Sequence, residues 1–184
     1  MSKLFFFDID GTLIDCNKGL YGISTVNRNS FDQLKQKGHD VFLATGRCKC
    51  FITEGVMDYP FSGYVTCNGG YVEYKGDAIY KAVVPAKAIE ETIKLSKEHH
   101  FSFYFESSDY IYVLDKNDPQ HKEFARVWGM KDETIIDDFD PQEIETYIGM
   151  IVVNSKEDIP LLVETLSPYF DIHFILKHAN FHLV

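Results

Sequence analysis

The sequence lacks any apolar run of the ~18 residues that a membrane-spanning helix needs. It is also poor in positive charge: 18 lysines and arginines stand against 28 aspartates and glutamates, for a formal net charge of −10. A general nucleic-acid surface requires clustered Lys and Arg, and an anionic membrane surface attracts basic segments. We therefore expect no nucleic-acid and no membrane partner. An anionic substrate would have to be attracted locally, which points to a metal ion.

Cysteine is scarce as well, and its spacing excludes the common zinc sites. The chain has four cysteines, at positions 16, 48, 50 and 67. A structural zinc site takes two separated ligand pairs, whereas here only Cys48 and Cys50 lie close in sequence. The first residues, MSKLFFFDIDG, reach an acid before an apolar segment long enough for a secretory signal. We expect a cytoplasmic, reducing compartment with buried or incidental thiols.

Apolar residues, in contrast, are plentiful enough for a core, at 45% hydrophobic and 15% aromatic. Buried strands are predicted over residues 3–9, 40–46 and 63–70. Helices are predicted between them, one beginning after the N-cap Ser24 and one around residues 48–57. Strand and helix in alternation predict an α/β fold with a doubly wound parallel sheet, whose ligands gather at the carboxyl ends of the strands.

The pattern changes after the third strand. Residues 71–84 are predicted to form a hairpin, and a helix followed by two strands then occurs twice. This pattern predicts a small α+β layer with an open antiparallel sheet. The acidic stretch 132–145 lacks the ligand order of a calcium loop, so we expect a solvated loop. We place two domains, at residues 1–82 and 83–184.

Two carboxylates follow the first strand in KLFFFDIDGTLID. Asp8 and Asp10 lie two residues apart, so in extended backbone they point to the same side, and like charges this close need a cation or a shared proton. The first could attack phosphorus, and the second could protonate a leaving oxygen and then activate water. Gly11 permits a tight turn whose amides hold phosphate oxygens. Mg²⁺, held by both acids, would supply the missing charge. The alternative is an acid pair in a solvated turn.

The ends of the next two predicted strands are polar too. In VFLATGR, the Thr45 hydroxyl and the amides of Gly46 and Arg47 are suited to hold a phosphoryl oxygen. A threonine that caps the next helix is the alternative, and it is compatible with the same role. Asn68 follows the third strand in YVTCNGG. We therefore expect all three clusters at one edge of the sheet.

These three stretches resemble motif I, motif II and the Asn-Gly loop of the haloacid dehalogenase (HAD) superfamily. More narrowly, they are similar to its Cof-type phosphatases, which carry a large α/β cap after the third strand. The resemblance covers essentially the whole chain. It implies a HAD-like Rossmannoid core, incomplete, over residues 1–82, and an inserted α+β cap over residues 83–184.

The resemblance also implies roles for the polar residues. Asp8 would be the nucleophile and a Mg²⁺ ligand. Asp10 would be the general acid/base and a second ligand, also through its backbone carbonyl. Thr45 would bind the transferring phosphoryl group, while Arg47 and Asn68 would lie near the substrate entrance. The implied activity is Mg²⁺-dependent hydrolysis of small phosphorylated metabolites, such as sugar phosphates, through an aspartyl-phosphate. A phosphomutase-branch relative and a non-catalytic HAD-like module are the alternatives.

The sequence departs from the family pattern at its end. The family has a Lys after the cap and then a Gly-Asp-x-x-Asn-Asp-like motif whose acids complete the metal site. Here the only Gly-Asp pair, Gly76–Asp77, precedes the cap, and Lys177 lies within the last predicted strands. We expect these 184 residues to correspond to the N-terminal part of such a phosphatase. By themselves they should bind magnesium poorly, turn over little substrate and leave an unpaired edge at the first strand.

For the histidines and aromatic residues in the second half of the sequence, a structural role is a simpler explanation than ligand binding. The histidine spacing fits no regular metal site, so we expect surface or internally satisfied side chains at His99, His100, His173, His178 and His182. The aromatic residues between positions 101 and 112 have no basic residues beside them, which argues against base stacking. Packing within the second domain is the simpler explanation.

Overall fold

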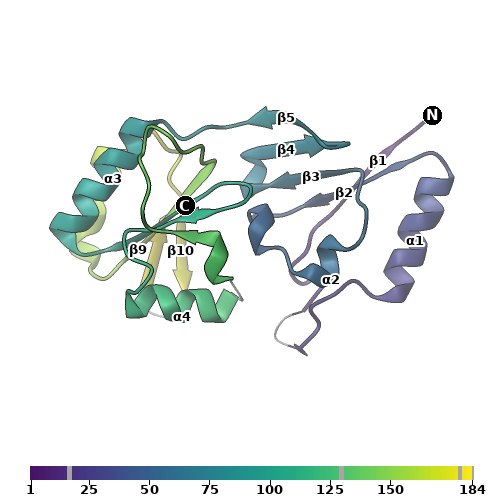
Figure 1. Cartoon of the computed structure of the whole chain (residues 1–184), viewed down its shortest axis with the longest axis horizontal. Coiled ribbons are helices and arrows are strands. Elements are labelled where there is room, and N and C mark those ends of the chain that lie inside the picture. The colour runs from purple at the N-terminus through teal and green to yellow at the C-terminus, as the bar shows by residue number, and fades with distance from the viewer. Residues whose placement is uncertain (16–17, 129–130, 178–179, 184) are drawn as a thin grey trace. The chain divides into compact units, whose positions relative to one another are not determined.

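The computed structural model describes residues 1–15, 18–128, 131–177 and 180–183. The chain divides into two compact units, Met1–Ala82 and Val83–Val184, which we call unit 1 and unit 2 and describe separately (Figure 1). Within the described ranges, no helix is long and apolar enough to cross a membrane.

Unit 1 is built on a five-stranded sheet in the order β1-β2-β3-β4-β5. The strands are β1 (Leu4–Phe7), β2 (Asp40–Ala44), β3 (Gly63–Thr66), β4 (Tyr71–Tyr74) and β5 (Asp77–Lys81). The first three are parallel, and β4 and β5 continue the sheet as an antiparallel hairpin. The three-strand parallel core and the hairpin predicted from the sequence are confirmed.

The first helix of unit 1, α1 (Thr25–Gln36), begins where the sequence predicts. The Ser24 hydroxyl accepts a hydrogen bond from the Asn27 amide at 3.2 Å, which caps the helix. Phe31 is the buried residue of α1 and packs in an apolar cluster with Val41 and Leu43 of β2. The cluster lies between α1 and the sheet, so this helix covers one face of the sheet.

The helical segment predicted around residues 48–57 is confirmed in part, because it is divided into two short helices. The structure has a 3-10 turn, η2 (Lys49–Phe51), and a short helix, α2 (Glu54–Met57). Ile52 and Thr53 between them have extended backbone, with ψ of 129° and 148°. The apolar spacing of this segment therefore does not come from one continuous helix.

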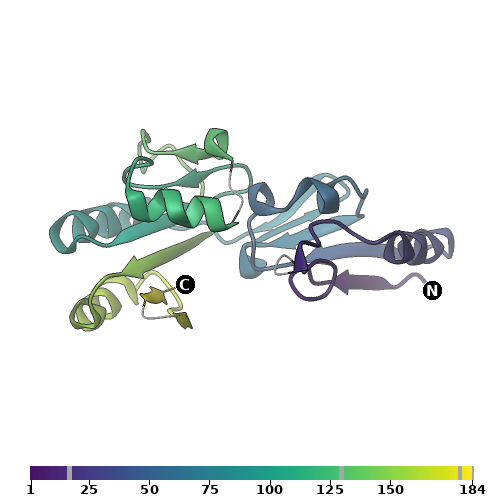
Figure 2. The same ribbon diagram turned by 90° about the horizontal axis from the view of Figure 1, so that it is seen from below.

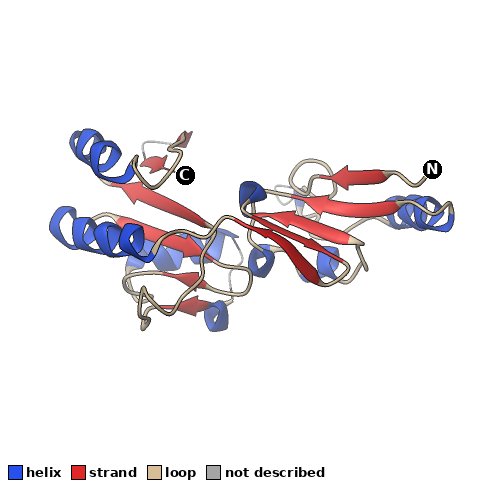
Figure 3. Ribbon diagram, turned by 90° about the horizontal axis from the view of Figure 1, so that it is seen from above, coloured by secondary structure: helices blue, strands red, loops and turns tan. Residues whose placement is uncertain are grey.

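Unit 2 contains a six-stranded sheet in the order β10-β11-β9-β6-β7-β8. Its strands are β6 (Ser102–Glu106), β7 (Ile111–Tyr112), β8 (Ile135–Ile136), β9 (Ile148–Val153), β10 (Phe174–Lys177) and β11 (Asn180–Leu183) (Figure 3). The pairs are antiparallel except β7–β8, which is parallel. The antiparallel prediction thus needs correction at one edge. The predicted solvated loop at 132–145 is wrong in part, because it contains η4 (Asp132–Thr134) and β8.

Helices cover both faces of this second sheet. They are α3 (Ala86–His99), α4 (Pro119–Trp128) and α5 (Ile159–Leu166), the last preceded by η5 (Lys156–Asp158). Phe103 and Phe105 of β6 pack in one apolar cluster with Ile89 of α3 and Leu162 of α5. Tyr104 lies between the two phenylalanines, so its side chain points to the other face. There its ring lies 5.4 Å from that of His121 on α4. Figure 2 shows the ribbon of α4 on the side of this sheet away from α3 and α5.

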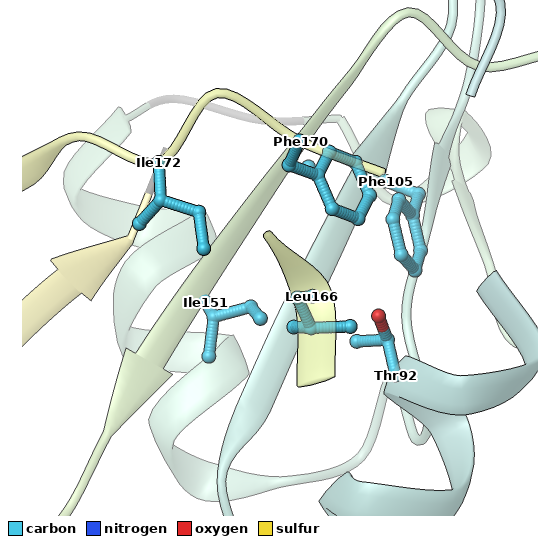
Figure 4. Close-up of a pocket in the computed structure, with 7 residues that line it drawn as sticks. Thr92, Phe105, Ile151, Leu166, Phe170 and Ile172 are labelled. Carbon is cyan, nitrogen blue, oxygen red and sulfur yellow. The ribbon is translucent and has the colours of Figure 1, made fainter. Parts of the chain in front are cut away.

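The core of unit 2 contains a small apolar cavity of about 20 Å³. Figure 4 shows the side chains of Phe105, Leu166 and Phe170 around it. The one hydroxyl in the lining, on Thr92, donates to the Ala88 carbonyl at 2.8 Å. Because the lining offers no unsatisfied polar group, this cavity is a packing gap.

The histidine prediction is confirmed for His99, whose Nδ1 lies 3.1 Å from an oxygen of Asp158. His178 and the side chain of His182 lie outside the described part of the chain. Position 121 was not considered in the sequence analysis. His121 is 3% exposed, and neither of its ring nitrogens has a hydrogen-bond partner within the described residues. Burial lowers the pKa of His121, although the charge of Asp118 opposes this shift.

Candidate active site

The carboxyl ends of β1, β2 and β3 lie side by side. In the register of the sheet, Phe7 pairs with Leu43, and Ala44 pairs with Val65. The Thr45 amide continues the ladder by donating to the Val65 carbonyl at 2.9 Å. The residues that follow each strand therefore emerge at one edge of unit 1, where ligands of parallel sheets bind.

The two aspartates lie at this edge with their side chains in solvent. Asp8 and Asp10 are exposed, while Ile9 between them is fully buried in the core. The two aspartates thus lie on the same side of the chain although β1 ends at Phe7 and Ile9 lies in a bend. The Thr12 hydroxyl donates to Asp8 Oδ2 at 3.3 Å, a long hydrogen bond. Asp8 is thus oriented by its own loop and remains accessible to a ligand.

The loop after the aspartates closes into a tight turn. Gly11 has φ of +79°, a left-handed conformation that glycine adopts without strain. Its amide donates to the Ile14 carbonyl at 2.9 Å, and the Leu13 and Ile14 amides donate to the Ile9 carbonyl. The Gly11 amide is therefore already hydrogen-bonded within the turn. This bond competes with the contact to a phosphate oxygen that the sequence predicts for Gly11. The role of Gly11 in this structure is its left-handed backbone conformation, which allows the tight turn.

Arg47 pairs with Asp10, a contact that the sequence analysis missed. Arg47 Nε and Nη2 donate to the two Asp10 carboxylate oxygens at 2.8 and 2.6 Å, a bidentate pair. The Arg47 side chain is only 10% exposed, against 50% for that of Asp10. Its Nη1 also donates to the Phe51 carbonyl at 2.9 Å. The positive charge nearest to Asp10 in this structure is therefore a guanidinium, where the sequence reasoning expected a metal alone.

Thr45 and Asn68 are the polar residues that follow β2 and β3 at this edge of the sheet. The buried Thr45 hydroxyl accepts a hydrogen bond from the Arg47 amide at 3.2 Å and keeps its own proton for donation. Asn68 has φ of +52°, and its Oδ1 lies 2.5 Å from the position that a Cβ on residue 46 would occupy. Gly46 therefore permits Asn68 to approach the turn after β2. The Cys67 amide ties the two loops together by donating to the Arg47 carbonyl at 3.0 Å.

The oxygen atoms at this edge fit Mg²⁺ better than a soft metal. Among the described residues, no group of three or more His, Cys, Asp or Glu side chains could hold a metal by itself. Mg²⁺ commonly takes one or two carboxylates and completes its shell with water and substrate phosphate. The Asp8 carboxylate could serve in this way. Because Arg47 engages both carboxylate oxygens of Asp10, the backbone carbonyl of Asp10 is the better candidate for the second ligand.

The fold and this edge define an α/β protein with an aspartate-based site at the carboxyl end of a parallel sheet. The sequence matches the haloacid dehalogenase-like hydrolase family over residues 5–183. The chain belongs to that family.

Relatives and solved structures agree with this assignment. The Bacillus subtilis (strain 168) protein named "Putative phosphatase YkrA" is 32% identical over 108 residues, which are 59% of this chain and 41% of YkrA. A hypothetical protein from Geobacillus kaustophilus HTA426 superposes on the whole chain with a TM-score of 0.81 at 19% identity, over 69% of its own length. The HAD subclass IIB sugar phosphatase BT4131 covers the whole chain at a TM-score of 0.72 and 20% identity, over 69% of its length.

These comparisons establish the family and the fold of the chain. The match to YkrA spans well under two thirds of that protein. The solved structures are below 25% identical to this chain, so they establish the shared fold. Activity and substrate are therefore matters for a proposal.

Proposed function

We propose that this chain carries the catalytic aspartates of a Mg²⁺-dependent phosphatase that hydrolyses small phosphorylated metabolites through an aspartyl-phosphate on Asp8. One observation carries the proposal: two exposed carboxylates after β1 lie at the same sheet edge as the Thr45 hydroxyl. Sugar phosphates are the substrate class we favour, because the similar protein BT4131 is a sugar phosphatase. We assign residues 1–82 to the HAD-like core, residues 83–184 to the cap, and the protein to the cytoplasm.

The residues at the edge divide the reaction between them. An oxygen of Asp8 attacks phosphorus, the bond to the leaving oxygen breaks, and Asp10 gives that oxygen a proton. Asp10 then takes a proton from the water that hydrolyses the aspartyl-phosphate. The Thr45 hydroxyl donates to an oxygen of the transferring group. A bound Mg²⁺ would neutralise charge on the phosphate and the carboxylates.

The hydrogen-bonded pair of Arg47 and Asp10 controls when Asp10 can transfer a proton. Arg47 engages both Asp10 carboxylate oxygens, so Asp10 can exchange a proton with substrate only when this pair loosens. A phosphate group offers arginine another bidentate acceptor. We propose that phosphate entry draws Arg47 away from Asp10, which leaves the Asp10 carboxylate free to take a proton from solvent and then act as the general acid.

Hydrolysis of p-nitrophenyl phosphate with and without Mg²⁺ tests this function. We expect Mg²⁺-dependent release of phosphate that is abolished in Asp8→Asn. The matched control is Asp58→Asn, since Asp58 is an exposed-side-chain aspartate at the end of α2 that pairs with Arg28. An Asp8→Asn variant as active as the parent would contradict the proposal.

We further propose that residues 1–184 act weakly by themselves. The strand β1 is at the edge of its sheet, with Leu4 and Phe6 54% and 53% exposed. The same assay on a chain extended by a further core segment should give a higher rate. Equal rates would defeat this expectation. No hydrolysis by either chain would favour the non-catalytic HAD-like module.

A further inference from the structure

Two cysteine sulfurs meet directly after Arg47. The Sγ atoms of Cys48 and Cys50 are 3.1 Å apart, Cys48 is fully buried, and Cys50 is half-buried. We propose that Cys48 and Cys50 form a thiol-oxidation site that closes to a disulfide with peroxide and loosens the Arg47–Asp10 pair.

The chain geometry allows this bond. Residues two apart in sequence are separated by at most about 7 Å, and disulfides join Cα atoms about 4.4–6.8 Å apart. The sulfurs must approach from 3.1 Å to a bond length of about 2.0 Å. Because only one residue lies inside the ring, the bond is strained. Strained disulfides are easily reduced, as a reversible modification in a reducing compartment requires.

The chemistry balances with peroxide as the oxidant. The exposed part of Cys50 makes it the first thiol to react: Cys50–SH and hydrogen peroxide give Cys50–SOH and water. The Cys48 sulfur then attacks the Cys50 sulfur, the S–O bond breaks, and a second water leaves. The two thiols lose two electrons and two protons, and the peroxide is reduced to two waters. A dithiol reverses the step by exchange.

The disulfide ring would act on the turn that holds Arg47. Cys48 is the N-cap of η2, and its carbonyl accepts from the Phe51 amide at 3.0 Å. The carbonyl of the same Phe51 accepts from Arg47 Nη1 at 2.9 Å. Drawing the sulfurs together changes the backbone of residues 48–50 and so displaces the Phe51 carbonyl. Arg47 then loses one of the contacts that fix its guanidinium against Asp10.

The effect on catalysis rests on the proposed function, whereas the oxidation site does not. If phosphate entry releases Asp10 by binding Arg47, a displaced Arg47 no longer offers phosphate its bidentate partner, and turnover falls. Oxidation would then reduce activity reversibly.

The first experiment tests the bond itself. The 184-residue chain is treated with hydrogen peroxide, alkylated and digested with trypsin, which cleaves after Lys49. We expect the peptides on either side of Lys49 to be joined until dithiothreitol separates them. Cys50→Ser should abolish the link, and Cys67→Ser should keep it. Oxidation of Cys50 only to sulfinic acid, or links to Cys67 or Cys16, would overturn the site.

The second experiment tests the coupling without any turnover. The chain has three arginines, and each Nε–H donates in the structure: Arg28 to Ile23, Arg47 to Asp10, and Arg126 to Glu123. In ¹⁵N-arginine spectra, we expect peroxide to accelerate exchange of the Arg47 Nε–H at least about ten-fold, as the loss of a hydrogen bond to a charged group implies. The Arg28 and Arg126 signals should stay unchanged and serve as folding controls.

Outcomes of the second experiment are decisive in both directions. In Cys50→Ser, peroxide should leave the Arg47 signal unchanged. A disulfide that forms without any change at Arg47 would refute the coupling. Phosphatase activity that persists in Asp8→Asn would refute the proposed function and would change neither of these two measurements, so the two proposals fail separately.

Discussion

Replacing Arg47 by lysine should destabilise unit 1 by a predictable amount. The Arg47 side chain donates two hydrogen bonds to Asp10 and one to the Phe51 carbonyl, and it is only 10% exposed. A lysine can keep the charge but lacks the planar fork, so we expect it to retain one of the three. Losing two bonds at about 0.5–1.5 kcal/mol each gives about 1–3 kcal/mol.

Amide hydrogen exchange measures this loss unit by unit. The destabilisation should raise exchange of the β2 amides about 5- to 150-fold and leave β6 and β9 of unit 2 unchanged. The matched control is Arg126→Lys, because Arg126 makes a bidentate contact to Glu123 between two exposed side chains. Such a surface pair contributes about 0–1 kcal/mol. Equal effects of the two substitutions, or no effect of Arg47→Lys, would refute the reasoning.

Three further predictions follow from single contacts. Gly46→Ala should displace Asn68, whose Oδ1 lies 2.5 Å from the new Cβ, and lower kcat/KM on the order of 10- to 100-fold; an unchanged value would place Asn68 outside the site. Gly149→Ala should cost unit 2 about 1–3 kcal/mol in urea unfolding, because its Cβ would lie 2.8 Å from the Phe105 ring. Burial lowers the pKa of His121, so the unfolded chain binds the proton more readily, and stability should fall as pH drops below about 6.5. His121→Phe should flatten that pH dependence in unfolding followed by the single tryptophan of α4; a slope equal to the parent's would contradict it.

The elements that could be predicted are those with strong local signals. Continuous apolar runs gave the parallel strands of unit 1, and Ser24 marked the start of α1 because its hydroxyl satisfies a helical amide. The break at residues 52–53 carries no such signal, since apolar residues on both sides continue a helical pattern. The strand β8 is two residues long and pairs with β7 from more than 20 positions away. Such a strand forms through tertiary contact rather than local preference.

In the candidate active site too, some features follow from local sequence and others depend on tertiary contacts. The sequence predicted Asp8 and Asp10 on one side from the period of an extended strand, and both are exposed around a buried Ile9, although the strand itself ends at Phe7. The Arg47–Asp10 pair joins residues 37 positions apart, and its geometry depends on how β1 and β2 align. The engaged amide of Gly11 likewise depends on how its turn closes. Motifs therefore predicted which residues gather, but not which of them already bind one another.

The most direct test of the central claim is beryllofluoride binding, because this ion mimics a phosphoryl group on a carboxylate and requires no turnover. With excess Mg²⁺, we predict a bound ¹⁹F signal in the parent chain and in Asp58→Asn, and none in Asp8→Asn or after chelation of the metal. A bound signal that survives in Asp8→Asn, or no bound signal in the parent chain, would contradict an aspartyl-phosphate at Asp8.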